Sequence, residues 1–182
     1  MQRRTLLATL ALPVLLAACE TPDAARSYLG GFGISARGAA LNAPFQFGDL
    51  SRWRGQADRA ALAVVQVEFL ADTFANSAYW SARVNPLVTM QVEAARTELR
   101  DYLGIPANAP PSLVMNRLQE AAAAVEAGDT PAAIAALSGP AFTRGGAETL
   151  RLLATMPRLP RTAVAAGAVN AEMTRLDNEH QG

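Results

Sequence analysis

Cysteine and histidine, which supply many nucleophiles, general bases and metal ligands, are almost missing from this 182-residue chain. The sequence contains one cysteine, Cys19, and one histidine, His180, which is third from the C-terminal end. A single cysteine excludes an internal disulfide. Zinc sites need several converging ligands, and a Ser–His–acid triad would depend on a histidine beside a frayed terminus. We therefore expect no catalytic residue, no metal site and no cofactor.

Lysine is absent, and all 16 basic side chains are arginine, matched by 16 aspartate and glutamate side chains. Without the first 18 residues, which contain Arg3 and Arg4, 14 basic side chains face 16 acidic ones. A near-neutral chain with no basic run and no charged tail lacks the electrostatic footprint of a nucleic-acid-binding protein. The composition predicts that nucleic acid is not a partner.

Two short patterns resemble enzyme motifs but lack the context that those motifs need. Residues 31–36 match the Gly-x-Gly-x-x-Gly/Ala dinucleotide pattern, but we expect neither a strand before them nor a helix after them. Residues 33–37 miss the nucleophile elbow because Arg37 stands at its last position. Glu68 and Asp72 are four residues apart, a spacing that is more typical of a solvated helix face than of acid–base chemistry. We expect that the protein is not an enzyme. The alternative is an enzyme whose active site consists of carboxylates and arginines in no familiar motif.

The first 18 residues have the pattern of an export signal. Arg3 and Arg4 form a short positive region, and residues 5–18 are apolar apart from two threonines. This run is shorter than the roughly 20 apolar residues that a membrane-spanning helix needs. It ends in Leu-Ala-Ala-Cys at residues 16–19, with small side chains directly before the cysteine.

This ending resembles the lipobox of bacterial lipoproteins, in which the cysteine thiol takes a diacylglyceryl group. The resemblance covers residues 1–19 and implies a signal peptide over residues 1–18, followed by Cys19 as the lipid-bearing first residue of the mature chain. It implies a cell-envelope protein with its domain in the periplasm. Glu20 favours the outer over the inner membrane, and Arg3 and Arg4 leave Sec and twin-arginine export both open. The alternative is an ordinary secretory signal with a spare cysteine.

Residues 19–48 have the composition of a tether between the lipid and a folded domain. They contain Pro22 and several glycines and show no sustained periodicity. We expect residues 43–48 to be extended, with Phe45 and Phe47 on the same side. The predicted domain boundary therefore lies at residue 49.

From residue 49 to residue 180 the apolar spacing is helical, and no strand-like alternation occurs. It predicts a long helix over residues 49–80, a second from Asn85-Pro86, a third over 111–127, a short fourth from Asp129 or Thr130, and two more over 148–156 and 161–179. In the last of these, Val164 is expected to face inward. Short loops favour antiparallel neighbours. The prediction is one all-α domain, a single bundle of about five to six helices.

Nine of the eleven aromatic residues lie between residues 28 and 80. This clustering indicates a ligand or partner surface, although a core built from these side chains is the alternative. The candidate surface consists of Phe45, Phe47, Trp53, Phe69, Phe74 and Trp80.

The sequence predicts a non-enzymatic, membrane-anchored envelope lipoprotein that binds or scaffolds another envelope protein. The alternative is a carrier of a small apolar ligand or lipid, held in a cleft between helices near Trp53, Phe69 and Trp80. A scaffold should expose an apolar patch, whereas a carrier should contain a concave apolar pocket.

Overall fold

The computed structural model describes residues 36–179, which contain eight α-helices, one 3-10 helix and no strand. The prediction of an all-α fold is confirmed, with more helices than the predicted five to six. In chain order the elements are α2 (Ala36–Gln46), η1 (Leu50–Trp53), α3 (Ala57–Asn76), α4 (Ala78–Ser81), α5 (Pro86–Leu103), α6 (Pro111–Glu126), α7 (Thr130–Ala136), α8 (Gly146–Ala154) and α9 (Pro160–Glu179).

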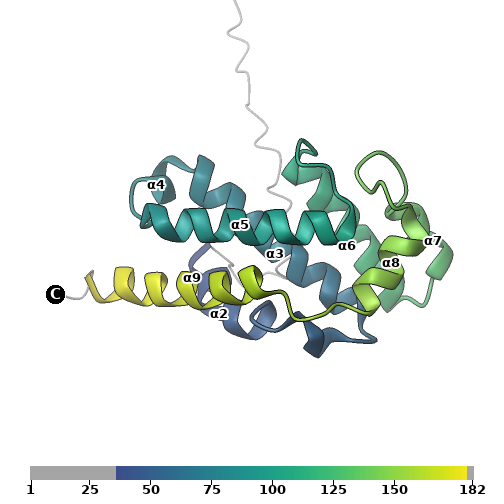
Figure 1. The fold of residues 1–182 in the computed structure, drawn as a ribbon, viewed down its shortest axis with the longest axis horizontal. Coiled ribbons are helices and arrows are strands. Elements are labelled where there is room, and N and C mark those ends of the chain that lie inside the picture. Colours follow the sequence, from purple (N-terminus) through teal and green to yellow (C-terminus); the bar gives the residue numbers. More distant parts are fainter. Residues whose placement is uncertain (1–35, 180–182) are drawn as a thin grey trace, which may run out of the picture.

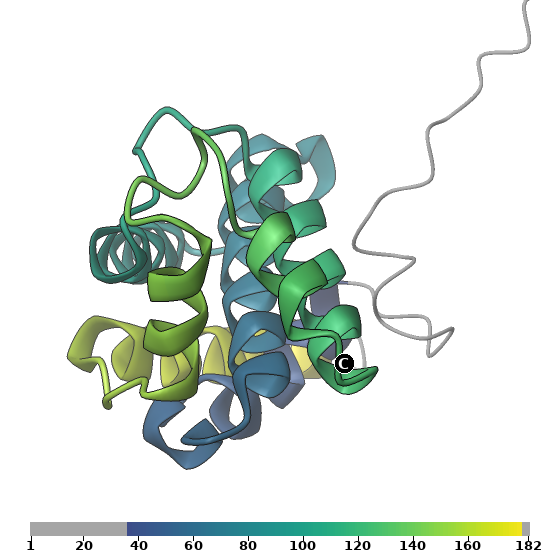
Figure 2. The same ribbon diagram turned by 90° about the vertical axis from the view of Figure 1, so that its right-hand side faces the viewer.

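Helix α3 lies at the centre of the fold and packs against α2, α5, α6 and α8 (Figures 1 and 2). Most of its side chains are buried, from Ala60 to Ala71 with few exceptions. A helix that is apolar almost all round is stable only when other elements cover every face. The apolar sequence of α3 therefore accounts for its central position.

The remaining helices pack around α3. Helices α6, α7 and α8 pack one after another, and α9 packs between α5 and α2. Figure 2 shows α3 between α6 and the pair formed by α5 and α9. Within residues 36–179, no helix is both long and apolar enough to cross a bilayer.

The predicted tether is wrong from residue 36 onward, because residues 36–46 form helix α2. Ala36, Ala39, Ala40 and Ala43 are buried at helical spacing, and α2 packs on α3 and α9. The buried Gln66 side chain of α3 donates a hydrogen bond to the Ala39 carbonyl. The folded domain thus includes residues before the predicted boundary at residue 49.

Residues 43–48 are also not extended as predicted. The helix continues to Gln46, so Phe45 and Phe47 point in different directions: Phe45 is 51% exposed and Phe47 is fully buried. The expectation that no helix follows the glycine-rich pattern at residues 31–36 is likewise wrong. A dinucleotide site of that type also needs a strand before residue 31, a part of the chain that lies outside the described residues.

The predicted helix over residues 49–80 is split into η1, α3 and α4. Gly55, with a φ of 81°, makes the turn between η1 and α3, and Asp49 caps η1 rather than α3. Ser77 ends α3 and caps α4 through its side chain. The predicted starts at Asn85 and Asp129 are confirmed, since each side chain accepts a hydrogen bond from a backbone N–H at the helix start.

Candidate docking surface

Helices α5 and α9 run antiparallel, and each supplies a carboxylate to the beginning of the other. Glu98 of α5 accepts hydrogen bonds from the backbone N–H of Arg161 (3.2 Å) and of Thr162 (2.8 Å) in the first turn of α9. Glu172 of α9 accepts one from the N–H of Asn85 at the start of α5 (2.8 Å). These N–H groups have no partner within their own helix, and a carboxylate there also complements the helix dipole. The reciprocal caps fix the register of the two helices.

Glu172 is the better buried of the two caps. Its pKa is lowered, first by hydrogen bonds from the Arg175 guanidinium at 2.7 and 2.8 Å and then by the N–H of Asn85, while burial acts in the opposite direction. The carboxylate is therefore ionised at neutral pH, as a cap requires. Figure 1 shows α5 and α9 side by side.

This pair exposes large apolar side chains along its outer surface. Leu87 and Met90 of α5 are 59% and 67% exposed, and Val164 of α9 is 56% exposed. Between the helices lies a shallow, open depression of about 250 Å³ whose lining is almost entirely apolar. We call this surface the α5–α9 seam; its residues are Leu87, Met90, Gln91, Ala94, Pro160, Arg161 and Val164.

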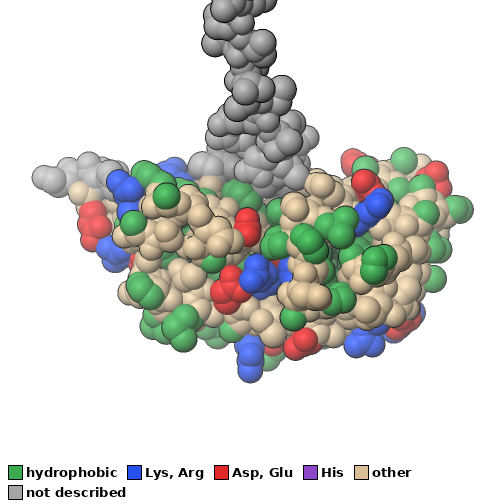
Figure 3. Space-filling model, turned by 90° about the horizontal axis from the view of Figure 1, so that it is seen from above, with side chains coloured by type: hydrophobic (Ala, Val, Ile, Leu, Met, Phe, Trp, Pro, Cys, Tyr) green, Lys and Arg blue, Asp and Glu red, His purple; other side chains and the backbone are tan. Residues whose placement is uncertain are grey.

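A second open depression, of about 440 Å³, lies on the other side of Val164 and is lined by Arg158, Pro160, Ala163 and Val164. One face of the molecule, shown in Figure 3, carries hydrophobic side chains in several groups separated by charged ones.

Sequence reasoning missed the seam. The prediction that Val164 faces inward is wrong, although Val169 and Met173, which were expected inward with it, are buried; the buried stripe contains Ala165, and Val164 lies beside it. In α5 the signal was present: Leu87 and Met90 lie off the stripe that contains Val88 and the other buried side chains. Apolar residues on a second helix face indicate either a second packing partner within the fold or exposure.

The predicted aromatic surface is not brought together by the fold. Phe47, Phe69 and Phe74 are buried in the core, whereas Phe45 is exposed and Trp53 and Trp80 are half-buried. Trp53 precedes α3 and Trp80 follows it, so the length of a 20-residue helix, about 30 Å, lies between them. The cleft predicted near Trp53, Phe69 and Trp80 is therefore not formed by these residues.

Within residues 45–80, the exposed and half-buried aromatic residues form two separate groups. At one end, Phe45 contacts Trp53 edge to face at 5.7 Å between ring centroids, with the Arg52 guanidinium over both rings. At the other end, Trp80 lies between Phe74 and Tyr79, and a shallow pocket of about 210 Å³ adjoins it. Each of the two groups is a local surface feature, and neither forms a ligand cleft.

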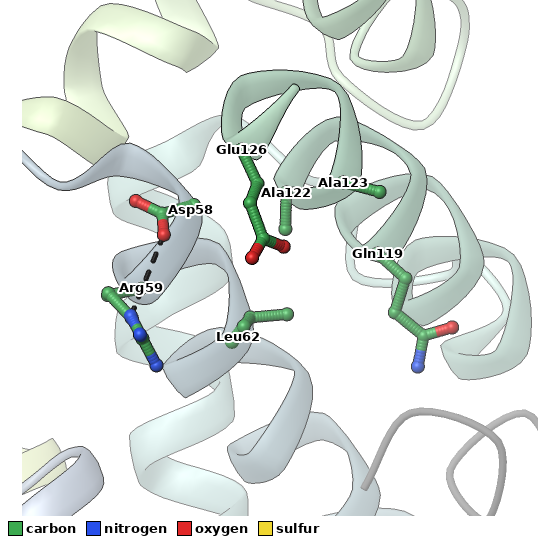
Figure 4. Close-up of a pocket in the computed structure, with 7 residues that line it drawn as sticks. All are labelled: Asp58, Arg59, Leu62, Gln119, Ala122, Ala123 and Glu126. Atoms are coloured by element: carbon green, nitrogen blue, oxygen red, sulfur yellow. Dashed lines mark ion pairs between the residues drawn. The ribbon is translucent and has the colours of Figure 1, made fainter. Parts of the chain in front are cut away.

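A further groove, of about 410 Å³, lies between α3 and α6 (Figure 4). Asp58 and Arg59 approach each other at 3.6 Å on one side, and Glu126 points in from the other. It is open and mixed in polarity, and its floor consists of Leu62 and alanine side chains. Its polar side chains line an open groove and not the enclosed, mostly apolar pocket that is typical of a small-molecule site.

The carboxylate with a raised pKa lies in the core and not in a groove. Burial raises the pKa of Glu68, and Arg100 opposes this through two hydrogen bonds of 2.7 Å. Glu68 therefore does not share a solvated face with Asp72, which instead accepts a hydrogen bond from Asn76. Among the residues that the structure describes, no group of three or more His, Cys, Asp or Glu side chains is placed to hold a metal ion. Cys19, the predicted lipidation site, lies outside these residues.

Comparisons of this chain with protein-family models, with curated proteins and with solved structures gave no match.

Proposed function

We propose that this protein is a lipid-anchored lipoprotein of the bacterial cell envelope whose helical domain binds or scaffolds another envelope protein without enzymatic activity. The anchor rests on the resemblance of residues 1–19 to a lipoprotein signal with its lipobox, and Cys19 is the only cysteine in the chain. Two or more acyl chains on that cysteine make membrane attachment stable, because each buried methylene contributes about 0.8 kcal/mol.

The observation that supports a binding role is the α5–α9 seam. Its exposed side chains Leu87, Met90 and Val164 lie on two helices whose register is fixed by reciprocal caps. A rigid surface loses little conformational entropy when a partner binds, so its apolar side chains are suited to become the centre of an interface.

The same surface favours a scaffold over the two alternatives. A carrier would enclose its ligand in a concave pocket, whereas the apolar depressions at the seam are shallow and open. An enzyme would place a perturbed carboxylate within reach of substrate, whereas Glu68 is only 1% exposed and engaged by Arg100.

The anchor is tested by the intact mass of the protein extracted from its own membranes. We expect a chain that begins at Cys19 and carries two or three acyl chains, and a Cys19→Ser variant that is no longer found in the membrane fraction. An unmodified cysteine, or a chain that begins elsewhere, would overturn the anchor.

The partner surface is tested by native mass spectrometry of gently extracted complexes. Met90→Asp places a charge in the seam, and Leu113→Asp is the matched control, since Leu113 is an exposed apolar residue of α6 away from the seam. We expect a bound envelope protein that is retained by Leu113→Asp and lost with Met90→Asp. A complex that survives Met90→Asp would show that the seam is not the interface, and a bound small molecule in its place would favour the carrier.

A further inference from the structure

The edge of the domain where α2 ends, η1 follows and α9 begins combines aromatic and arginine side chains. We call it the basic edge and define it by Phe45, Arg52, Trp53, Arg54 and Arg158. Arg52, Arg54 and Arg158 are exposed, as is Phe45, and Trp53 is half-buried. The depression lined by Arg158, Pro160 and Val164 connects this edge to the seam.

The aromatic part of the basic edge is held in place by local contacts. The Arg52 guanidinium lies 4.1 Å from the ring centroid of Phe45 and donates a hydrogen bond of 2.7 Å to the Phe45 carbonyl. The Trp53 indole donates a hydrogen bond of 2.8 Å to the carbonyl of Gln46. The edge therefore presents two ordered rings beside a cation that is fixed against them.

The charge of the basic edge is strongly positive for so small an area. Of its three arginines, Arg158 and Arg52 lie close enough to Asp49 to act on its carboxylate, and Arg161 in the first turn of α9 adds a fourth arginine beside them. Hydrogen bonding from the Ser51 hydroxyl is the largest cause that lowers the pKa of Asp49, and Arg158 and Arg52 lower it further. Over the described part of the chain, the side chains of Arg54, Arg158 and Arg161 form no salt bridge.

The α4 end of the domain also exposes aromatic residues, but two of its arginines are paired with carboxylates. Its Arg37 forms a bidentate pair with Asp177, and Arg175 is engaged by Glu172 and Glu179. Arg37 and Arg175 are therefore neutralised locally, and Arg83 lies over the Tyr79 ring. In the basic edge, Arg54 and Arg158 have neither a carboxylate nor a ring partner among the described residues, so they remain available to an anionic partner.

We propose that the basic edge docks on the anionic surface of the lipid bilayer to which the chain is anchored. Arginine side chains pair with lipid phosphates bidentately, and aromatic side chains are favoured at the depth of the headgroups. Pro160 and Val164 add apolar contact beside Arg158. This inference rests on the proposed lipid anchor and adds to it the orientation of the domain on the membrane.

The chain between the anchor and the domain is long enough for this contact. Residues 19 and 36 are 17 residues apart, and a chain of that length can span up to about 60 Å. Helix α2, with 11 residues, adds only about 16 Å between its first residue and the basic edge. Attachment at Cys19 therefore permits the edge to reach the bilayer surface.

The two tryptophans allow a direct test, because Trp53 belongs to the basic edge and Trp80 lies at the α4 end. The protein in its lipid-bearing form is reconstituted into vesicles of phosphatidylglycerol and phosphatidylcholine with brominated acyl chains, which quench nearby indoles. We expect quenching of Trp53 in a Trp80→Phe variant and none of Trp80 in a Trp53→Phe variant. Quenching of Trp80 alone, or of neither, would overturn the proposal; in the latter case the exposed arginines would be left for a protein partner.

The contribution of the arginine charges to docking is tested in the wild-type background, where both tryptophans are kept. Arg54→Gln and Arg158→Gln should each lower the ratio of docked to undocked protein about fivefold, and 1 M salt should abolish docking because it shortens the Debye length to about 3 Å. The control Arg83→Gln removes an exposed arginine at the α4 end and should have no effect. Unchanged quenching in both variants, or equal quenching on vesicles of phosphatidylcholine alone, would also contradict the proposal.

A failed anchor and a failed orientation can be distinguished. If the intact mass shows no lipid, the thiol of Cys19, the only one in the chain, is coupled to a maleimide phospholipid in the same vesicles. Quenching of Trp53 would then support the basic edge although the natural anchor is absent. If Trp53 were not quenched in this chemically anchored protein, docking of the basic edge on the bilayer would be refuted independently of the natural anchor.

Discussion

The buried pair of Glu68 and Arg100 gives the sharpest prediction about this fold. Both side chains are almost completely buried, and they share two hydrogen bonds of 2.7 Å between α3 and α5. The remaining Arg100 nitrogen donates to the carbonyls of Pro106, Ala107 and Ala109, at 3.0 to 3.2 Å. The pair thus joins the central helix, α5 and the loop before α6.

Replacing either partner alone with methionine leaves an uncompensated charge in the core. Glu68→Met and Arg100→Met should each lower the free energy of unfolding by about 3–5 kcal/mol. For a domain of this size the corresponding fall in Tm is roughly 10–20 °C. The double variant removes both charges together, and we expect its stability to lie within about 2 kcal/mol of the wild type.

The pH dependence separates the two single variants. Burial already raises the pKa of Glu68, and Arg100 is its main counterweight, so the loss of Arg100 raises this pKa further. A group with a raised folded-state pKa stabilises the fold below its unfolded pKa, and this stabilisation is lost as the pH rises through the folded pKa. Arg100→Met should therefore recover stability on acidification relative to wild type, whereas Glu68→Met should not.

The assay is urea unfolding followed by circular dichroism for the wild type, both single variants and the double variant. The coupling free energy comes from the resulting double-mutant cycle. A double variant that loses the sum of the two single losses would refute the pairing argument. A loss below about 1 kcal/mol for Glu68→Met would show that Arg100 reaches water without its partner.

Three further predictions test the packing and the caps. Gly146→Ala should cost about 1–3 kcal/mol in urea unfolding, because a Cβ there would overlap the Ile134 carbonyl; the control Gly167→Ala meets open space inside α9 and should stabilise by about 0.5–1 kcal/mol. Ala40→Leu should cost about 1–3 kcal/mol if α2 is packed as described, whereas Asn42→Leu on its exposed side should change stability by less than about 0.5 kcal/mol. Glu172→Gln should differ most from the wild type above about pH 4.3, and the difference in unfolding free energy should vanish as the pH falls through the lowered pKa of Glu172; a constant difference across this range would contradict the proposed cap.

The parts of the fold that local chemistry determines could be predicted from the sequence. Asn85 followed by proline and Asp129 shortly before proline mark two helix starts, and both side chains act as caps. Gly104 ends α5 in the left-handed conformation that glycine adopts without strain, at a φ of 72°. Each of these signals involves only neighbouring residues, so no knowledge of the tertiary structure is needed to interpret it.

Helix α2 could not be predicted in this way, because its stability comes from distant partners. Gly38 and Pro44 weaken the local tendency to form a helix. The helix is held by burial of its alanines against α3 and α9 and by the bidentate pair between Arg37 and Asp177. Short helices in proteins generally depend on such packing. Only the spacing of the buried alanines was visible beforehand.

The same dependence on tertiary structure explains the outcome for the candidate site. Phe45 and Phe47 have similar neighbours in the sequence, yet Phe45 is exposed and Phe47 is buried. The reason is that α2 ends at Gln46, between the two residues, so that their side chains point in different directions. Arg100 resembles any polar residue of an amphipathic helix, and only Glu68, alone within an apolar stretch of α3, indicated that a charged partner was needed in the core.

The seam and the basic edge are compatible with one orientation of the domain. Helix α9 begins at the basic edge and α5 runs antiparallel to it, so the seam extends away from that edge along both helices. From Ala94 to Leu87 the seam advances about 10 Å along α5. With the basic edge on the bilayer, Val164 would lie close to the headgroups, and Leu87 and Met90 would lie farther out. A partner would then bind the seam from the aqueous side, while the lipid anchor and the arginines would hold the domain in a fixed orientation.

Met90→Asp should consequently remove the partner without changing the quenching of Trp53, whereas Arg158→Gln should reduce the quenching of Trp53. If Met90→Asp released the domain from the bilayer as well, the two surfaces would have to be a single membrane-binding face.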